Sequence, residues 1–145
     1  MSTNTITVDK SNFLQNNVDT TKIFLGKNES FVAQFTAGVT DVLLEAGTLM
    51  GRIAATQKVV PLESAATDGS QSPVGILNST RNVLATTTVS VAIVNKGDVA
   101  RKQVIFDGTD TFTTLVDDRS LEDRIASDTA GIILVKTSEL TNFDN

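Results

Sequence analysis

The distribution of hydrophobic and polar residues divides the chain near position 29. The first part is dominated by Asn, Thr, Asp, Ser and Lys with scattered apolar residues, whereas the rest is denser in Val, Ile, Leu and Gly. This change predicts an N-terminal arm over residues 1–29, flexible in part, and a β domain over residues 30–145. Within the arm, residues 5–8 alternate polar and apolar side chains with the period of a strand, and residues 23–25 are a second apolar run.

The body has the pattern of a mainly β domain, because short apolar runs are separated by glycines and polar turn residues. The expected strands cover residues 31–35, 48–54, 57–62, 74–77, 89–94 and 104–106. Turns are expected at residues 95–98 and 107–110, where Asn, Asp and Gly gather. We therefore predict a β-rich α+β fold, a compact small barrel or sandwich of short strands with one short helix, preceded by the extended arm.

The single helix is expected between residues 117 and 126. Leu121 and Ile125 stand four residues apart and would share one helix face. The residues suited to cap its start are Asp117, Asp118 and Ser120. After the helix, Gly131 separates it from residues 132–135, which are apolar throughout and predict a buried closing strand.

Length and charge narrow the class of protein. A chain of 145 residues is long enough to bury its own core as one domain. No apolar stretch has the length of a membrane span and the N-terminus has no secretory pattern, so we expect synthesis in a cytoplasm and no membrane partner. The formal charge of −5 argues against nucleic acid as a partner, because it repels phosphates.

The residue inventory argues against an enzyme. The chain contains no His and no Cys, which excludes Ser-His-Asp and Cys-His nucleophiles and the usual zinc sites. A carboxylate-dependent enzyme stays open as an alternative, and its candidate residues are Asp107, Asp110, Asp117 and Asp118. Because these acids fall in expected turns and at a helix start, a structural role is favoured. No cofactor, metal or catalytic site is predicted.

Lys96 supports a second alternative, because it falls in the turn expected at residues 95–98. A lysine at a hairpin tip is the site that biotin and lipoyl carrier domains present, which suggests a cytosolic binding or carrier module. The flanking residues, Asn95 and Gly97, differ from the Met-Lys-Met or Asp-Lys-Ala of those families. An ordinary solvated turn lysine is therefore the favoured interpretation.

A series of glycine turns and aliphatic runs carries a family resemblance. It consists of Ala46-Gly47-Thr48-Leu49-Met50-Gly51, the Asp68-Gly69 turn, Val74-Gly75-Ile76-Leu77, residues 89–94 with Lys96-Gly97, residues 104–106, and the helix with its closing Ala-Gly-Ile-Ile-Leu-Val. In order and spacing these residues resemble the lambdoid type of bacteriophage head decoration protein, the cement protein of icosahedral capsids. Two departures are a longer region at residues 107–120 and an arm without Pro.

The resemblance implies a structural viral protein. It implies a homotrimer in the virion, bound to the phage major capsid protein on the outer surface of an expanded head, which it stabilises against internal DNA pressure. Each arm is then expected to add a strand to a sheet of the shell protein. The expected capsid-binding residues are Thr5, Ile6, Thr7, Val8, Phe13 and Leu14. No residues are assigned to the trimer interface.

Overall fold

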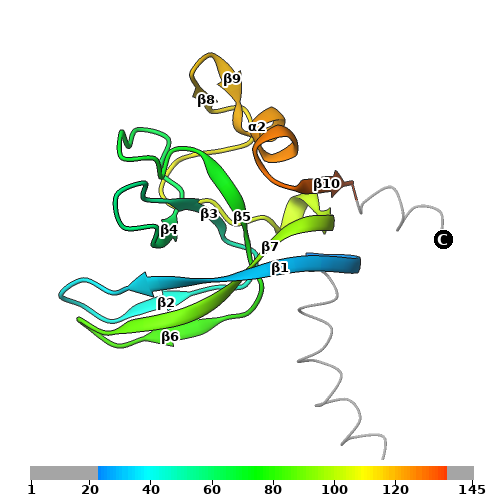
Figure 1. Ribbon diagram of the computed structural model, residues 1–145. Helices are drawn as coiled ribbons and strands as arrows, with labels where there is room; N and C mark the ends of the chain where they lie inside the picture. The colour runs from blue at the N-terminus through cyan, green and yellow to red at the C-terminus, as the bar shows by residue number, and fades with distance from the viewer. Residues whose placement is uncertain (1–22, 137–145) are drawn as a thin grey trace, which may run out of the picture.

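The computed structural model describes residues 23–136 and confirms a β-rich fold (Figure 1). The strands are β1 (Phe24–Thr36), β2 (Val42–Leu44), β3 (Leu49–Arg52), β4 (Val59–Pro61), β5 (Pro73–Leu77), β6 (Arg81–Val83), β7 (Thr88–Ala100), β8 (Leu115–Val116), β9 (Arg119–Ser120) and β10 (Gly131–Val135). The helical elements of the described residues are the short 3-10 helix η1 (Arg101–Gln103) and the α-helix α2 (Leu121–Asp128). None of these helices is long and apolar enough to cross a membrane.

One six-stranded sheet organises the domain. Its strands follow the order β1-β7-β5-β3-β4, and β10 adds to β7 in the parallel sense. Strand β7 is central because β1 pairs with it along one side, while β5 and then β10 pair with it along the other. The pairs β2-β6 and β8-β9 form two small separate sheets.

The two ends of the sheet are brought together by side chains. Lys58, directly before β4, donates a hydrogen bond of 2.8 Å from its Nζ to the Oγ1 of Thr36 at the end of β1. The guanidinium of Arg52 on β3 lies 4.7 Å from the centre of the Phe31 ring on β1. No backbone ladder joins β1 to β4 in the described residues, so the sheet curls like the predicted small barrel but stays open at this seam.

Apolar side chains form two core clusters. One lies among the strands β1 to β7 and includes Phe35, Met50 and Ile93. The other joins the sheet to α2 and includes Leu121, Ile125 and Ile132, together with β3 and β5 residues. The two helix residues chosen from their spacing, Leu121 and Ile125, are both fully buried, as the sequence predicts.

The helix begins at the last of its three predicted caps. Ser120 accepts a hydrogen bond of 3.2 Å from the N–H of Asp123 through its Oγ. Asp117 and Asp118 are not caps, because they have positive φ angles of 53° and 65° and form the turn between β8 and β9. Asp and Asn tolerate this left-handed conformation better than other residues with a side chain.

Two strand-level predictions are wrong. Residues 95–98 are not a turn: they lie inside β7, where β1 on one side and β10 on the other hold them extended. Tertiary pairing therefore outweighs their turn composition. Residues 104–106 form no continuous strand, because only Ile105 makes a bridge, to Thr48. The short strands β2, β6, β8 and β9 were not predicted.

The closing strand is confirmed over Gly131–Val135, although it is only half buried. Ile132 is 2% exposed, whereas Ile133 is 60% exposed. At the other end of the chain, β1 begins at Phe24, so residues 24–29 of the predicted arm form the first part of this strand. The division into arm and body otherwise stays a prediction.

An ion pair joins η1 to α2. Arg101 donates to Glu122 through Nε at 2.8 Å and through Nη2 at 3.2 Å, and its guanidinium lies 4.2 Å from the centre of the Phe112 ring. The hydrogen bond from Arg101 lowers the pKa of Glu122 below its usual value. Because the folded state favours the ionised carboxylate, this stabilisation is present above the carboxylate's unfolded pKa and is lost as the pH falls through its folded pKa.

Glu122→Gln is therefore expected to destabilise the domain at neutral pH and not in acid. Since both side chains are partly exposed, we expect a loss of about 0.5–1 kcal/mol at pH 7. The difference from the parent chain should shrink as the pH falls below about 4. Urea unfolding followed by circular dichroism at pH 7 and pH 3 measures it. Glu45→Gln is the control, and an equal loss at both pH values contradicts the electrostatic explanation.

Candidate functional site

The predicted capsid-binding residues Thr5, Ile6, Thr7, Val8, Phe13 and Leu14 lie outside the described residues. The structure does describe the place where the predicted arm joins the sheet. Phe24 at the start of β1 lies opposite Val99, and Val135 at the end of β10 lies opposite Ala100. The start of β1 and the end of β10 therefore lie at the same end of β7, on either side of it (Figure 1).

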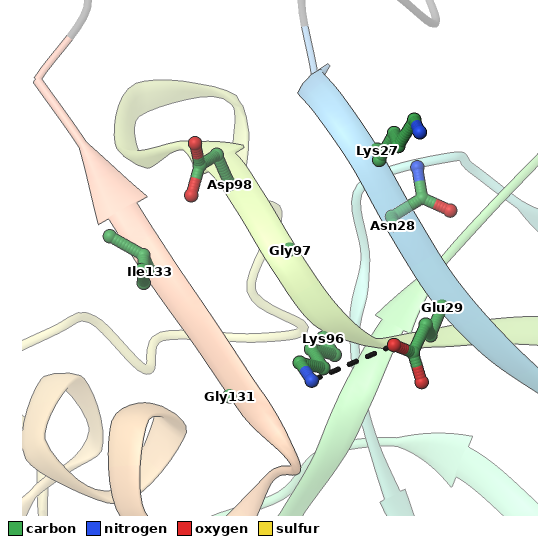
Figure 2. A pocket seen from close by; sticks show the side chains of 8 residues that line it. All are labelled: Lys27, Asn28, Glu29, Lys96, Gly97, Asp98, Gly131 and Ile133. Carbon is green, nitrogen blue, oxygen red and sulfur yellow. Dashed lines mark ion pairs between the residues drawn. The ribbon is translucent and has the colours of Figure 1, made fainter.

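A shallow groove lies on the outer face of the sheet beside this junction (Figure 2). Its lining residues come from three neighbouring strands and are Lys27, Asn28, Glu29, Lys96, Gly97, Asp98, Gly131 and Ile133. The Nζ of Lys96 lies 3.6 Å from the Oε2 of Glu29, and the two side chains are 56% and 72% exposed. A pair this exposed contributes at most about 1 kcal/mol. The groove is therefore a solvated surface and not a buried charged site.

Gly97 makes the floor of the groove. Its φ is +136°, and a Cβ built on it would lie 2.9 Å from the Cβ of Asn28 and 3.0 Å from the carbonyl oxygen of Lys27. Strand β1 therefore passes close over the backbone of β7 at this point. The register of β1 also shifts between Phe24 and Asn28, as at a β-bulge. The groove thus results from a glycine and an irregular strand.

The structure contradicts the premise of the carrier-module alternative. Lys96 is not at a hairpin tip, because its backbone pairs with Glu29 of β1 and with Gly131 of β10. A modifying enzyme needs a protruding lysine with an accessible backbone on both sides, and here a strand lies on each side (Figure 2). Lys96 is an exposed lysine in the middle of a three-stranded surface.

Two of the four acidic candidates, Asp110 and Asp117, have structural contacts. Asp110 accepts hydrogen bonds from the backbone N–H of Ser64 at 2.9 Å and from its hydroxyl at 2.6 Å. Asp117 contacts Arg124 at 3.2 Å. Within residues 23–136, no three acidic side chains are grouped as a metal site requires. Asp110 and Asp117 therefore fasten loops.

Exposed apolar side chains are surface features that sequence reasoning missed. Val39 is 90% exposed, and Leu43 and Leu84 are 61% and 58% exposed. The loops around Val39 and Leu84 are joined by hydrogen bonds, one of them 2.8 Å from the N–H of Thr86 to the carbonyl of Gly38. They lie at the end of β1 and β7 away from the arm junction (Figure 1). No sequence signal marks them, because single apolar residues between the expected strands have no periodic pattern that separates exposed from buried positions.

Comparison with known proteins agrees with the sequence resemblance. The family model described as bacteriophage lambda head decoration protein D matches residues 27–118. No curated protein matches the chain. The matched region runs from within β1 to the turn between β8 and β9, and so includes the main sheet except residues 24–26 of β1 and all of β10. Since this match covers well over half of the chain, the chain belongs to the family of the bacteriophage lambda head decoration protein D, a family of structural phage capsid proteins.

Proposed function

We propose that this chain is a cement protein, which binds as a homotrimer to the outside of an expanded icosahedral phage head and stabilises it against internal DNA pressure. The observation that carries the proposal is the family match over residues 27–118. The lack of His and Cys and the structural use of the acidic residues support a role without chemistry. Its partners are then two further copies of itself and the phage major capsid protein.

The arm supplies the binding energy in this proposal. Ile6 and Val8 fall on one face of the predicted strand, and this face packs on a shell protein when the strand joins a sheet of the shell. Ordering such a segment costs roughly 2–5 kcal/mol, so one arm alone binds weakly. Three arms on one trimer bind at high effective concentration, which raises the avidity by roughly 10²–10⁴.

The described domain supports this use of the arm through β1. The strand has 13 residues, and its residues from Ser30 to Thr36 pair with β7 in one unbroken register. A pull on the arm along the axis of β1 loads many of these hydrogen bonds together and not one after another. The strand that follows the arm is therefore a firm anchor for a protein that bridges shell subunits.

Charged substitutions inside and outside the predicted arm strand test the proposal in the full chain. Ile6→Asp with Val8→Asp is expected to reduce binding to expanded heads at least about 100-fold, because the avidity of three arms is lost. Asn16→Asp with Asn17→Asp adds the same charge to the arm outside the predicted capsid-binding residues and is the matched control. Co-sedimentation with expanded heads measures binding. Equal binding by both double variants would sink the arm mechanism.

A further inference from the structure

Strand β10 forms an open edge of unusual composition. It consists of Gly131, Ile132, Ile133, Leu134 and Val135, with no charged residue and no Pro. It pairs with β7 on one side, and within residues 23–136 no strand pairs with its other side. Natural proteins usually protect such edges with charges, Pro, bulges or a covering segment, because an open apolar edge recruits other strands. The composition of β10 therefore calls for a covering segment.

The hydrogen bond of Ile132 shows which backbone groups of β10 point to its open edge. The N–H of Ile132 donates 3.2 Å to the Oγ1 of Thr129 and so points away from β7. Because alternate residues of a strand direct their polar groups to the same side, the N–H and C=O of Leu134 point to the open edge as well. The side chain of Ile133 is 60% exposed on the outer face, beside the groove (Figure 2). A short strand would satisfy the N–H and C=O of Leu134 and cover Ile133.

Strand β1, at the other edge of this end of the sheet, is protected in the usual way. Its first part carries Lys27 and Glu29, and its register with β7 is interrupted between Phe24 and Asn28. Charges and bulges both discourage a further strand. Of the two edges at this end of the sheet, β10 is the one that is regular, apolar and open.

We infer that, in the free protein, Thr5, Ile6, Thr7 and Val8 of the chain's own arm add to the open edge of β10. Residues 9–22 can span roughly 50 Å when extended, whereas the start of β1 and the end of β10 are two strand spacings apart, about 10 Å. The short segment matches the short free edge in length. Its alternation places Ile6 and Val8 on one face, where they cover Ile133.

The docked arm regulates the proposed function. A strand held on β10 must leave it before it pairs with the shell protein, so the apparent affinity of each arm falls by the fraction of arms that are released. The same docking protects β10 against pairing with other copies. The transfer of the arm from β10 to the shell protein rests on the proposed function. The docking itself is a property of the free chain and is tested without phage heads.

Engineered disulfides test the docking, since the chain has no Cys of its own. Ile133→Cys is combined with Ile6→Cys or with Val8→Cys in the full chain. The control combines the same arm cysteines with Leu25→Cys, a partly exposed position that is nearer to the arm along the chain. If the arm is only tethered and does not dock, its cysteine oxidises faster with Leu25→Cys, because position 25 is nearer along the chain. Docking predicts that at least one pair with Ile133 oxidises within one chain at least about 10-fold faster than its Leu25 control.

The outcomes are distinguishable by intact mass and by gel mobility without reductant. Faster oxidation with Leu25, equal rates, or disulfides between chains overturn the inference. Hydrogen exchange at the amide of Leu134 is the second measurement: Ile6→Asp with Val8→Asp should exchange at least about 10-fold faster than Asn16→Asp with Asn17→Asp. Equal exchange in the two double variants also overturns the inference. If docking fails while the first double variant still loses head binding, the proposed function stands.

Discussion

Gly75→Ala is expected to destabilise the domain strongly and to lower its urea midpoint. Gly75 lies in β5, between β3 and β7, and a Cβ there would lie 2.5 Å from the Cγ2 of Ile93 and closer still to the backbone carbonyl of Val94. Ile93 and Val94 are fully buried in β7, which is held by strands on both sides, so neither can move away cheaply. We expect a cost of about 3–5 kcal/mol, against a total stability of about 5–15 kcal/mol.

Gly26→Ala is the matched control for this change. Gly26 also lies in a strand, but a Cβ on it would meet no atom within 4 Å. Urea unfolding followed by far-ultraviolet circular dichroism is the suitable measurement, because the chain has no Trp or Tyr to report by fluorescence. We expect Gly26→Ala to unfold at the midpoint of the parent chain. A Gly75→Ala midpoint equal to that of Gly26→Ala contradicts the packing argument.

Arg124→Ala is expected to cost about 2–3 kcal/mol. The side chain is 11% exposed and fastens α2 to its surroundings. It donates from Nη2 to the hydroxyl of Ser72 at 2.7 Å and from Nη1 to the carbonyl of Val116 at 3.1 Å. Its Nε donates to Asp128 at 2.9 Å. Truncation leaves these acceptors without their charged donor, and each loss costs more than the net value of the bond.

Two further variants separate the geometry of Arg124 from its charge. Arg119→Ala removes a more exposed arginine, which donates to Ser127, and should cost no more than about 0.5 kcal/mol. Arg124→Lys keeps the charge but lacks the planar fork, so it should fall between the parent chain and the Ala variant. The same urea measurement ranks all three. Equal midpoints for Arg124→Ala and Arg119→Ala would show that the network adds no stability.

The sequence predicted those elements in which local pattern and tertiary contacts agree. The spacing of Leu121 and Ile125, with Ser120 before them, specifies α2, because the same residues that favour a helix also face the core. The run from Val74 to Leu77 likewise becomes β5. In these segments the local preference and the global fold point the same way.

The prediction failed where tertiary pairing outweighs local preference. Asn, Lys, Gly and Asp at residues 95–98 favour a turn, yet two neighbouring strands hold them extended. That pairing depends on β10, which is more than thirty residues away in the sequence and cannot be read from the turn itself. The candidate site shares this limit, because the groove exists only where β1, β7 and β10 meet.

The glycines that carry the family resemblance have a packing reason in this fold. A Cβ on Gly51 would collide with the backbone of Ser70, and one on Gly75 would collide with that of Val94. Both positions therefore exclude any side chain. The spacing of these glycines in the sequence follows from the places where one backbone segment packs directly against another. This explains why an ordered set of small and aliphatic residues is sufficient to indicate the family, although it contains no reactive group.

The most direct test of the proposed function uses phage heads that hold packaged DNA and lack their decoration protein. The full chain is added in increasing amounts, and the temperature at which the heads release DNA is measured against the number of bound chains. We predict that the release temperature rises and reaches its plateau at a bound number that is a multiple of three per binding position. Saturating binding with no change in the release temperature, or no binding at all, would contradict the account.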